Sequence, residues 1–164
     1  VGMKEKNGGQ YSIETLVSMG CEKFGAIFKS DDRQGLLRYA GFCDGLLNSN
    51  QNLDSAVVRW YTTEDFDVES RKFSSSIIDD LENVDGLVCY NDQVTFSVLN
   101  TFYEKGLKLP KIISFDHSLI CDVFPDNVIS IGHRKDQLGV VAATKMINML
   151  EGKKEESTFL DWIV

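Results

Sequence analysis

Short apolar runs alternate with stretches of helical period along most of this chain, and this alternation limits the possible folds more than any other feature. Five runs have the length and composition of buried strands: 24–28, 55–61, 87–90, 111–115 and 127–131. Helical stretches precede, separate and follow these runs. Strand–helix–strand units of this kind form right-handed parallel crossovers. The sequence therefore predicts an α/β fold in three layers, with a mostly parallel sheet and helices on both of its faces.

Two of these strands end abruptly in polar residues. The run that ends at Cys89 and the run that ends at Phe115 lead directly into Tyr90, Asn91, Asp92, Asp116 and His117. The crossover rule places both ends at the same edge of the sheet. Open α/β sheets bind their ligands at that edge, so these residues are the first candidates for a binding site.

The chemistry of these side chains suits a sugar. Carboxylates and amides bond neighbouring hydroxyls, a guanidinium donates two parallel bonds, and aromatic rings cover C–H surfaces. Arg38, on a helix predicted over 33–48, supplies a guanidinium, and Tyr90, Phe115 and Trp60 supply rings. Each has an ordinary alternative: Asp92 as a helix N-cap, Arg38 as a solvated helix residue and Trp60 as part of the core. Both interpretations stay open at this point.

Helical periodicity gives further expectations. Gly8 and Gly9 precede the first helical stretch, where they allow a tight turn or, alternatively, hold an anion at the helix N-terminus. The core face of the helix over 33–48 is predicted to contain Leu36, Tyr39 or Ala40, Cys43 and Leu47. The last helix, over about 134–151, is predicted to present an apolar face made of Leu138, Val141, Ala142, Met149 and Leu150.

Composition and motifs exclude several classes of protein. The chain has 164 residues, enough for one domain, and its 25 acidic residues against 17 basic ones would repel nucleic acid. Its four cysteines stand singly and no histidine has metal-ligand spacing, so no metal site is expected and the compartment is predicted to be reducing. Without a nucleophile elbow, P-loop or dinucleotide fingerprint, we expect no catalytic residues and no cofactor.

The ends of the chain carry two more expectations. No apolar run is long enough for a membrane span and the first residues lack a signal pattern, so the protein is predicted to be cytoplasmic, with no membrane partner. The chain starts at Val1 and closes with an extended apolar segment, which suggests a fragment of a longer protein.

Four motifs in order carry a family resemblance. They are Ile27-Phe-Lys-Ser-Asp-Asp32, Arg38-Tyr-Ala-Gly-Phe42, Cys89-Tyr-Asn-Asp92 and Ile113-Ser-Phe-Asp116. With them the chain resembles the effector-binding domain of the lactose- and galactose-repressor family, and most of all its arabinose-repressor branch. The resemblance implies one lobe of a type I periplasmic-binding-protein-like fold. Residues 1–164 are similar to the C-terminal lobe alone, with the other lobe and the DNA-binding domain absent.

The resemblance also implies a function and a site. It implies a transcriptional repressor that binds a pentose-like sugar such as arabinose, and a homodimer whose DNA affinity changes when the two lobes close. DNA would be contacted only through the absent N-terminal domain. The implied sugar-binding residues are Lys4, Glu5, Arg38, Tyr90, Asn91, Asp92, Asp116 and His117.

Two points stay open. Many relatives have a second aspartate where this chain has His117, so the identity of the sugar is uncertain. The same lobe also fits a sugar-binding receptor for transport, and a small flavodoxin-like enzyme or receiver domain is a weaker alternative because its acidic cluster or cofactor loop is missing.

Overall fold

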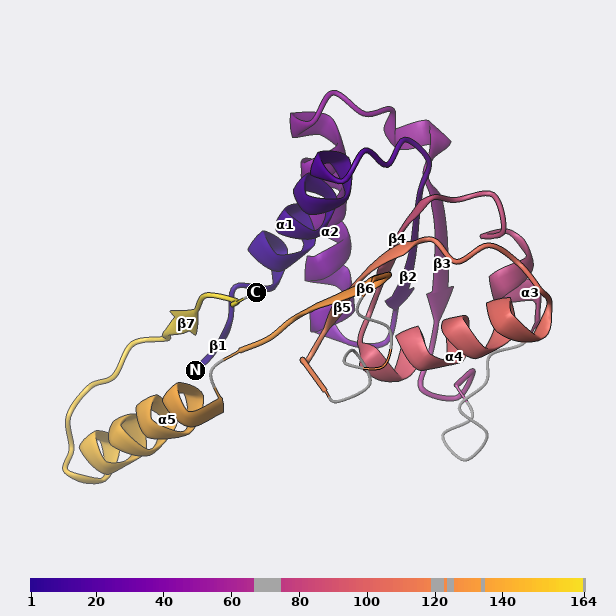
Figure 1. The fold of residues 1–164 in the computed structure, drawn as a ribbon. Helices are drawn as coiled ribbons and strands as arrows, with labels where there is room; N and C mark the ends of the chain where they lie inside the picture. Colours follow the sequence, from indigo (N-terminus) through magenta and orange to yellow (C-terminus); the bar gives the residue numbers. More distant parts are fainter. Residues whose placement is uncertain (67–74, 119–122, 124–125, 134, 164) are drawn as a thin grey trace.

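A computed structural model describes residues 1–66, 75–118, 123, 126–133 and 135–163 of the chain (Figure 1). In chain order the elements are β1 (Gly2–Met3), α1 (Glu5–Ser18), β2 (Phe24–Lys29), α2 (Arg33–Asn48), a short 3₁₀ turn η1 (Leu53–Ser55), β3 (Val57–Tyr61), α3 (Ser75–Asp79), β4 (Gly86–Cys89), α4 (Asp92–Glu104), β5 (Lys111–Phe115), β6 (Val128–Ile131), α5 (Lys135–Leu150) and β7 (Phe159–Leu160). The predicted alternation is confirmed. The predicted helix positions Val68 and Phe73 lie outside the described residues.

The main sheet has five strands in the order β3-β2-β4-β5-β6, and every neighbouring pair is parallel. The chain first moves outward from β2 to β3, then returns to the other side of β2 and continues through β4, β5 and β6. The direction of winding therefore reverses between β2 and β4. In open α/β sheets the crevice at such a reversal is the usual ligand site.

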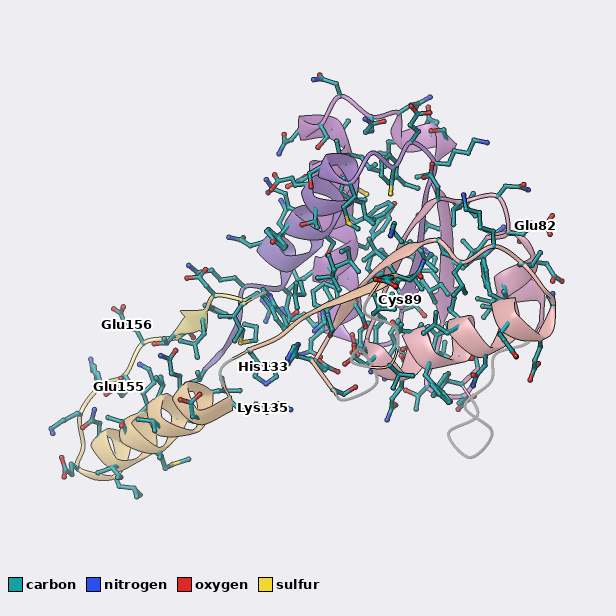
Figure 2. The ribbon with its side chains drawn as sticks, in the orientation of Figure 1. Glu82, Cys89, His133, Lys135, Glu155 and Glu156 are labelled. Carbon is teal, nitrogen blue, oxygen red and sulfur yellow. The ribbon has the colours of Figure 1, made fainter. Side chains whose placement is uncertain are left out.

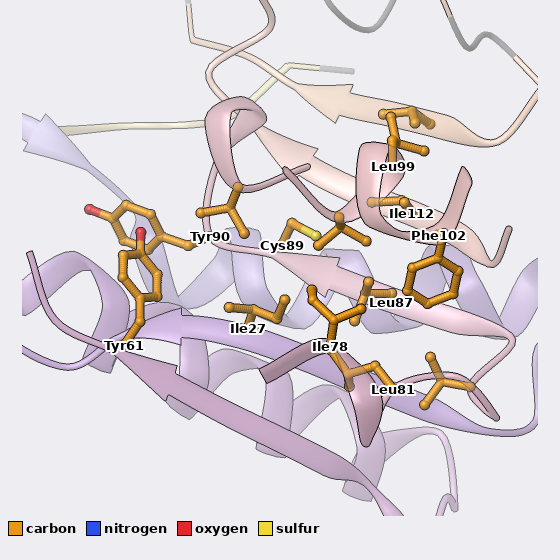
Figure 3. Close-up of a cluster of buried hydrophobic side chains, with 14 of the residues drawn as sticks. Ile27, Tyr61, Ile78, Leu81, Leu87, Cys89, Tyr90, Leu99, Phe102 and Ile112 are labelled. Atoms are coloured by element: carbon orange, nitrogen blue, oxygen red, sulfur yellow. The ribbon is translucent and has the colours of Figure 1, made fainter. Parts of the chain in front are cut away.

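Helices cover both faces of this sheet, as predicted. On one face α1 and α2 bury Ile13, Leu16, Phe42 and Leu46 against the strands. On the other face α3 and α4 bury a second cluster, which includes Ile78, Leu81, Leu99 and Phe102 (Figure 3). The two clusters make a three-layer α/β fold, because apolar side chains that alternate along buried strands need a partner on each face.

The first helix differs from the expectation. It starts at Glu5, so Gly8 and Gly9 lie inside α1, and neither a tight turn nor an anion site forms there. A Cβ atom on Gly9 would lie only 2.1 Å from the carbonyl oxygen of Arg38, and one on Gly41 would lie 1.9 Å from that of Lys6. These glycines let the backbones of α1 and α2 touch, which explains their presence within helices.

The second helix turns a different face to the core than its leucines suggested. Leu36 and Leu47 are 52% and 59% exposed, whereas Arg38, Phe42 and Leu46 are buried. The predicted core face of α2 was therefore wrong. Apolar residues occur around most of this helix, and the close glycine contact with α1 selects which of them face inward.

The last helix forms where it was predicted but does not cover the sheet. α5 has no buried residue, and Met149 and Leu150 of the predicted apolar face are largely exposed. Figure 1 shows α5 beside β1 and β7 and outside the three layers. β1 and β7 pair in parallel as a separate two-stranded sheet. Among the described residues no helix is long and apolar enough to cross a membrane.

Candidate functional site

Arg38 sits in an aromatic cage at the edge where the strands end. The carbon at the centre of its guanidinium group lies 4.1 Å from the ring centre of Phe115, 5.0 Å from Tyr90 and 5.2 Å from Trp162. Only 2% of the residue is exposed. Arg38 is thus not a solvated helix residue. The three rings are hereafter called the cage.

A buried ion pair fixes the direction of the guanidinium. Nε of Arg38 donates to Oε2 of Glu5 at 2.8 Å, and Nη1 donates to the carbonyl oxygen of Tyr90. A charge that is taken out of water needs such partners, because an unpaired one would strongly destabilise the fold. The pair joins the start of α1 to α2 and to the end of β4, so two of the predicted site residues, Glu5 and Arg38, do meet.

Tyr90 extends this network along the edge. Its hydroxyl donates to Oδ2 of Asp32, and Nε2 of Gln34 donates to Oε1 of Glu5 at 3.2 Å. Burial, followed by the nearby Asp32 carboxylate, raises the pKa of Tyr90, so the phenol stays neutral. The sequence offered no signal for Asp32 or Gln34 beyond their place at the start of a helix.

Asn91 and Asp92 divide their tasks differently from the expectation. Asn91, and not Asp92, is the N-cap of α4, since its Oδ1 accepts from the backbone N–H of Val94 at 3.1 Å. Asp92 is the first helical residue and is buried. Its carboxylate accepts from the hydroxyls of Ser114 and Ser130. Asp92 therefore ties the ends of β4, β5 and β6 together, and direct sugar contact by either residue stays a prediction.

Asp116 and His117 have an unusual backbone. Their φ angles are 91° and 46°, in the left-handed region that residues other than glycine seldom adopt. The backbone N–H of His117 donates to Oγ of Ser130 at 2.9 Å, and that of Asp116 donates to the carbonyl of Ile131 at 3.1 Å. Conformations of this kind are costly and gather at functional sites.

The Asp116 carboxylate is the open acceptor of this edge. Within the described part of the chain no side chain or backbone group donates a hydrogen bond to it, although the residue is partly buried. Burial raises the pKa of Asp116, and the Arg38 charge acts in the opposite direction. Asp116 therefore combines desolvation, a neighbouring cation and free lone pairs, which is what a ligand hydroxyl requires.

The other predicted residues are placed as follows. Nζ of Lys4 forms a salt bridge with Asp161 at 2.8 Å, and both side chains are exposed. Trp60 packs on Tyr39 and Phe28 at the sheet's edge strand and does not belong to the cage. Contact of Lys4 or His117 with a sugar is not tested by this structure and stays a prediction.

Two residues at this edge were missed by sequence reasoning. Trp162 packs on Phe115, and its Nε1 donates to the carbonyl of Lys4 at 3.1 Å. His133 meets the Trp162 ring edge-on at 6.0 Å, and its buried Nδ1 has no hydrogen-bond partner. Figure 2 shows His133 and Lys135 at the junction between the sheet and α5. Only the fold brings these residues to the strand ends.

The cysteines behave as small apolar residues where the structure describes them. Cys21 and Cys89 are buried, and burial raises the pKa of Cys89 to about 12. Cys121 lies outside the described residues. A search of the described residues for groups of metal-ligating side chains finds none.

Comparison with known proteins now decides the family. The model of the periplasmic binding protein-like domain matches residues 13–161. The chain belongs to this family. The predicted family resemblance and fold class are thereby confirmed, since similar proteins include regulators of the lactose-repressor type.

Curated relatives support the same placement. The chain is 26% identical over 160 residues to the arabinose metabolism transcriptional repressor of Halalkalibacterium halodurans, covering 95% of this chain and 43% of that protein. It is also 26% identical to the repressor of the same name from Geobacillus stearothermophilus, over 92% of this chain and 43% of that protein. This periplasmic binding protein-like chain thus spans less than half the length of these relatives. They are named as regulators, in agreement with the expectation that the protein is not an enzyme.

Solved structures share the fold. A periplasmic binding protein/LacI transcriptional regulator from Alkaliphilus metalliredigens, complexed with D-xylulofuranose, superposes with a TM-score of 0.81 at 22% identity, over 98% of this chain and 61% of that one. A LacI family regulator from Enterococcus faecium with bound ribose gives a TM-score of 0.81 at 18% identity, over 98% of this chain and 61% of that one. At these identities the likeness concerns the fold.

Proposed function

We propose that this chain is the C-terminal lobe of the sugar-sensing domain of a transcriptional repressor, and that its effector is a pentose-like sugar such as arabinose. One observation carries the proposal: the open Asp116 carboxylate shares the strand-end edge with the caged Arg38, in a chain similar to two arabinose repressors. Asp116 would accept from sugar hydroxyls. Asn91, Asp92, Tyr90, Lys4, Glu5 and His117 are the further proposed contacts.

A second lobe completes the proposed sensor. The exposed apolar residues of α5 support this part of the proposal, because a helix of this composition is stable in water only against a partner. We propose that α5, β1 and β7 lie against that lobe, and that residues 1–164 form one lobe of a longer, dimeric protein. The negative net charge of −8 agrees with DNA contact through a separate domain.

The proposed mechanism is a shift of population. A sugar that touches both lobes binds the closed form more tightly than the open form, and the protein closes only as far as this difference in affinity allows. Closure then changes the spacing of the dimer and with it the affinity for the operator. A single lobe leaves half of the sugar exposed to water, so the 164-residue chain alone is expected to bind sugar weakly.

The test uses the protein encoded by the complete gene, purified and mixed with L-arabinose, D-xylose, D-ribose and D-galactose. We expect one pentose to raise the melting temperature and to change binding to DNA from its own upstream region. The variant Asp116→Ala should lose both responses while it stays folded. A protein that responds to none of these sugars would contradict the sensing role. A response in melting temperature together with an export signal in the gene would favour the transport receptor instead.

A further inference from the structure

We infer that Trp162 is a positioning residue for sugar binding: its indole holds the Arg38 guanidinium at the strand-end edge and links it to the segment that follows β7. This inference rests on the proposed function for its consequence, and on the contacts of Trp162 for its geometry. It concerns a residue that touches Arg38 and is not itself offered as a sugar contact.

The first support is the arrangement around the guanidinium. Phe115 and Trp162 are themselves in contact, with ring centres 5.2 Å apart and planes at 74°. Both lie within cation–π distance of Arg38, at 4.1 Å and 5.2 Å. A planar guanidinium between aromatic faces is held in orientation as well as stabilised, and the attraction grows when water is excluded.

The second support is the hydrogen bond of the indole. Nε1 of Trp162 donates to the carbonyl of Lys4 at 3.1 Å, one residue before Glu5, which forms the ion pair with Arg38. The Trp162 ring and the Glu5 carboxylate therefore hold Arg38 from two segments that are themselves joined. Next to Trp162, Ile163 exchanges backbone hydrogen bonds with Gly132, so a third segment is fixed at the same point.

The third support is Gly8. A Cβ atom at this position would lie 2.7 Å from Nε1 of Trp162 and 2.9 Å from the Phe115 ring. Contacts this short are not tolerated, so the Trp162 indole reaches Arg38 only because residue 8 has no side chain. Gly8 thus offers a way to displace the indole without changing Trp162.

The arrangement has a consequence for sensing. The segments at Lys4, Gly132 and Trp162 connect the sheet with the outlying unit of β1, β7 and α5. A movement of that unit relative to the sheet would pull on Trp162, and through it on Arg38. Affinity for the sugar and the position of the unit are then linked, and such coupling is reciprocal.

The experiment follows the side-chain Nε–H signal of Arg38 by NMR in the encoded protein, labelled with ¹⁵N-arginine and assigned with Arg38→Lys. We expect the Trp162→Leu variant to shift this signal and to speed its hydrogen exchange by about tenfold or more, because the covering ring is lost. Trp162→Phe should keep much of the protection, since a ring remains. Gly8→Ala should act in the same direction as Trp162→Leu.

Two matched controls separate positioning from general destabilisation. Trp60→Leu removes the other tryptophan, which packs outside the cage, and Gly139→Ala adds a methyl group to a helical glycine with no atom within 4 Å of that position. Neither should alter the Arg38 signal. An unchanged Arg38 signal in both Trp162→Leu and Gly8→Ala would overturn the inference.

A second readout joins the geometry to the sugar. Calorimetry with L-arabinose should show affinity about tenfold weaker for Trp162→Leu and unchanged for Trp60→Leu, a change that corresponds to ~1.4 kcal/mol. Equal affinities in the presence of a shifted Arg38 signal would also overturn the inference. If the unaltered protein binds none of the tested pentoses, the proposed function fails, while the Arg38 signal still decides whether Trp162 positions Arg38.

Discussion

Helices α4 and α5 make an instructive pair. Both are apolar along much of their length and both form where periodicity predicts them. α4 lies on the sheet and buries Val94, Val98, Leu99 and Phe102, whereas α5 buries nothing. An apolar face thus reveals that a helix has a packing partner, but not where in the protein that partner lies.

The same contrast holds for charges. Glu5 and Arg38 form a buried pair inside the three-layer body, while Lys4 and Asp161, close by, form an exposed one. Sequence patterns treat the two pairs alike. Their energetic weight differs because water screens the exposed pair and is absent around the buried one. Three substitutions test how far the two regions differ.

The largest effect is expected for Glu5→Ala. It leaves the Arg38 guanidinium buried without its carboxylate, which typically lowers the free energy of unfolding by about 3–5 kcal/mol. Urea denaturation measures the loss. The matched change in the exposed pair, Asp161→Ala, should alter the free energy of unfolding by less than about 1 kcal/mol. Equal losses in the two variants would show that the boundary between the regions is drawn wrongly.

The next effect compares two leucines. Leu99→Ala in α4 should lower the free energy of unfolding of the 164-residue chain by about 2–5 kcal/mol, because the residue is 2% exposed and its removal leaves a cavity. Leu150→Ala in α5, where the residue is 81% exposed, should change it by no more than about 0.5 kcal/mol.

Repeating the Leu150→Ala measurement in the encoded protein sharpens this comparison. A clear loss of stability there, absent from the 164-residue chain, would support a second lobe over α5. The same small effect in both proteins would argue against that part of the proposal.

The smallest effect concerns Asp116 and depends on pH. Burial raises its pKa in the folded state, so the unfolded state releases the proton more readily and the ionised carboxylate destabilises the fold at neutral pH. Asp116→Asn should therefore raise the melting temperature at pH 7 by about 1–3 °C without sugar. The gain should fade as the pH drops towards the ordinary aspartate value of about 4, where both states are protonated.

Asp31 provides a control of opposite sign for this measurement. Hydrogen bonds from the side chain and backbone of Thr63 lower the pKa of this exposed carboxylate. Its charge therefore stabilises the fold above the ordinary pKa, and Asp31→Asn should lower the melting temperature slightly at pH 7. A gain from Asp31→Asn, or a loss from Asp116→Asn, would mean that these environments are misread.

Much of the architecture could be predicted, because strands and helices leave periods of two and 3.6 residues in the sequence. The polar strand ends at Asn91 and Asp116 were also readable, since a break from apolar to polar residues marks the end of a buried strand. The rotation of α2 was not readable, because its glycine contact with α1 involves two backbones and no pattern of side chains. The capping role of Asn91 was assigned one residue too late for a similar reason: both residues cap helices well.

The sequence by itself thus determined the order of the elements, the parallel sheet and the edge where a ligand would bind. Tertiary structure alone decided which side chains meet at that edge. It gathers Glu5, Arg38, Phe115 and Trp162 from four distant segments and leaves α5 outside the body. The physical reason is that local patterns record how a segment meets water or the core, whereas cages, ion pairs and unpartnered faces depend on contacts between segments far apart in the chain.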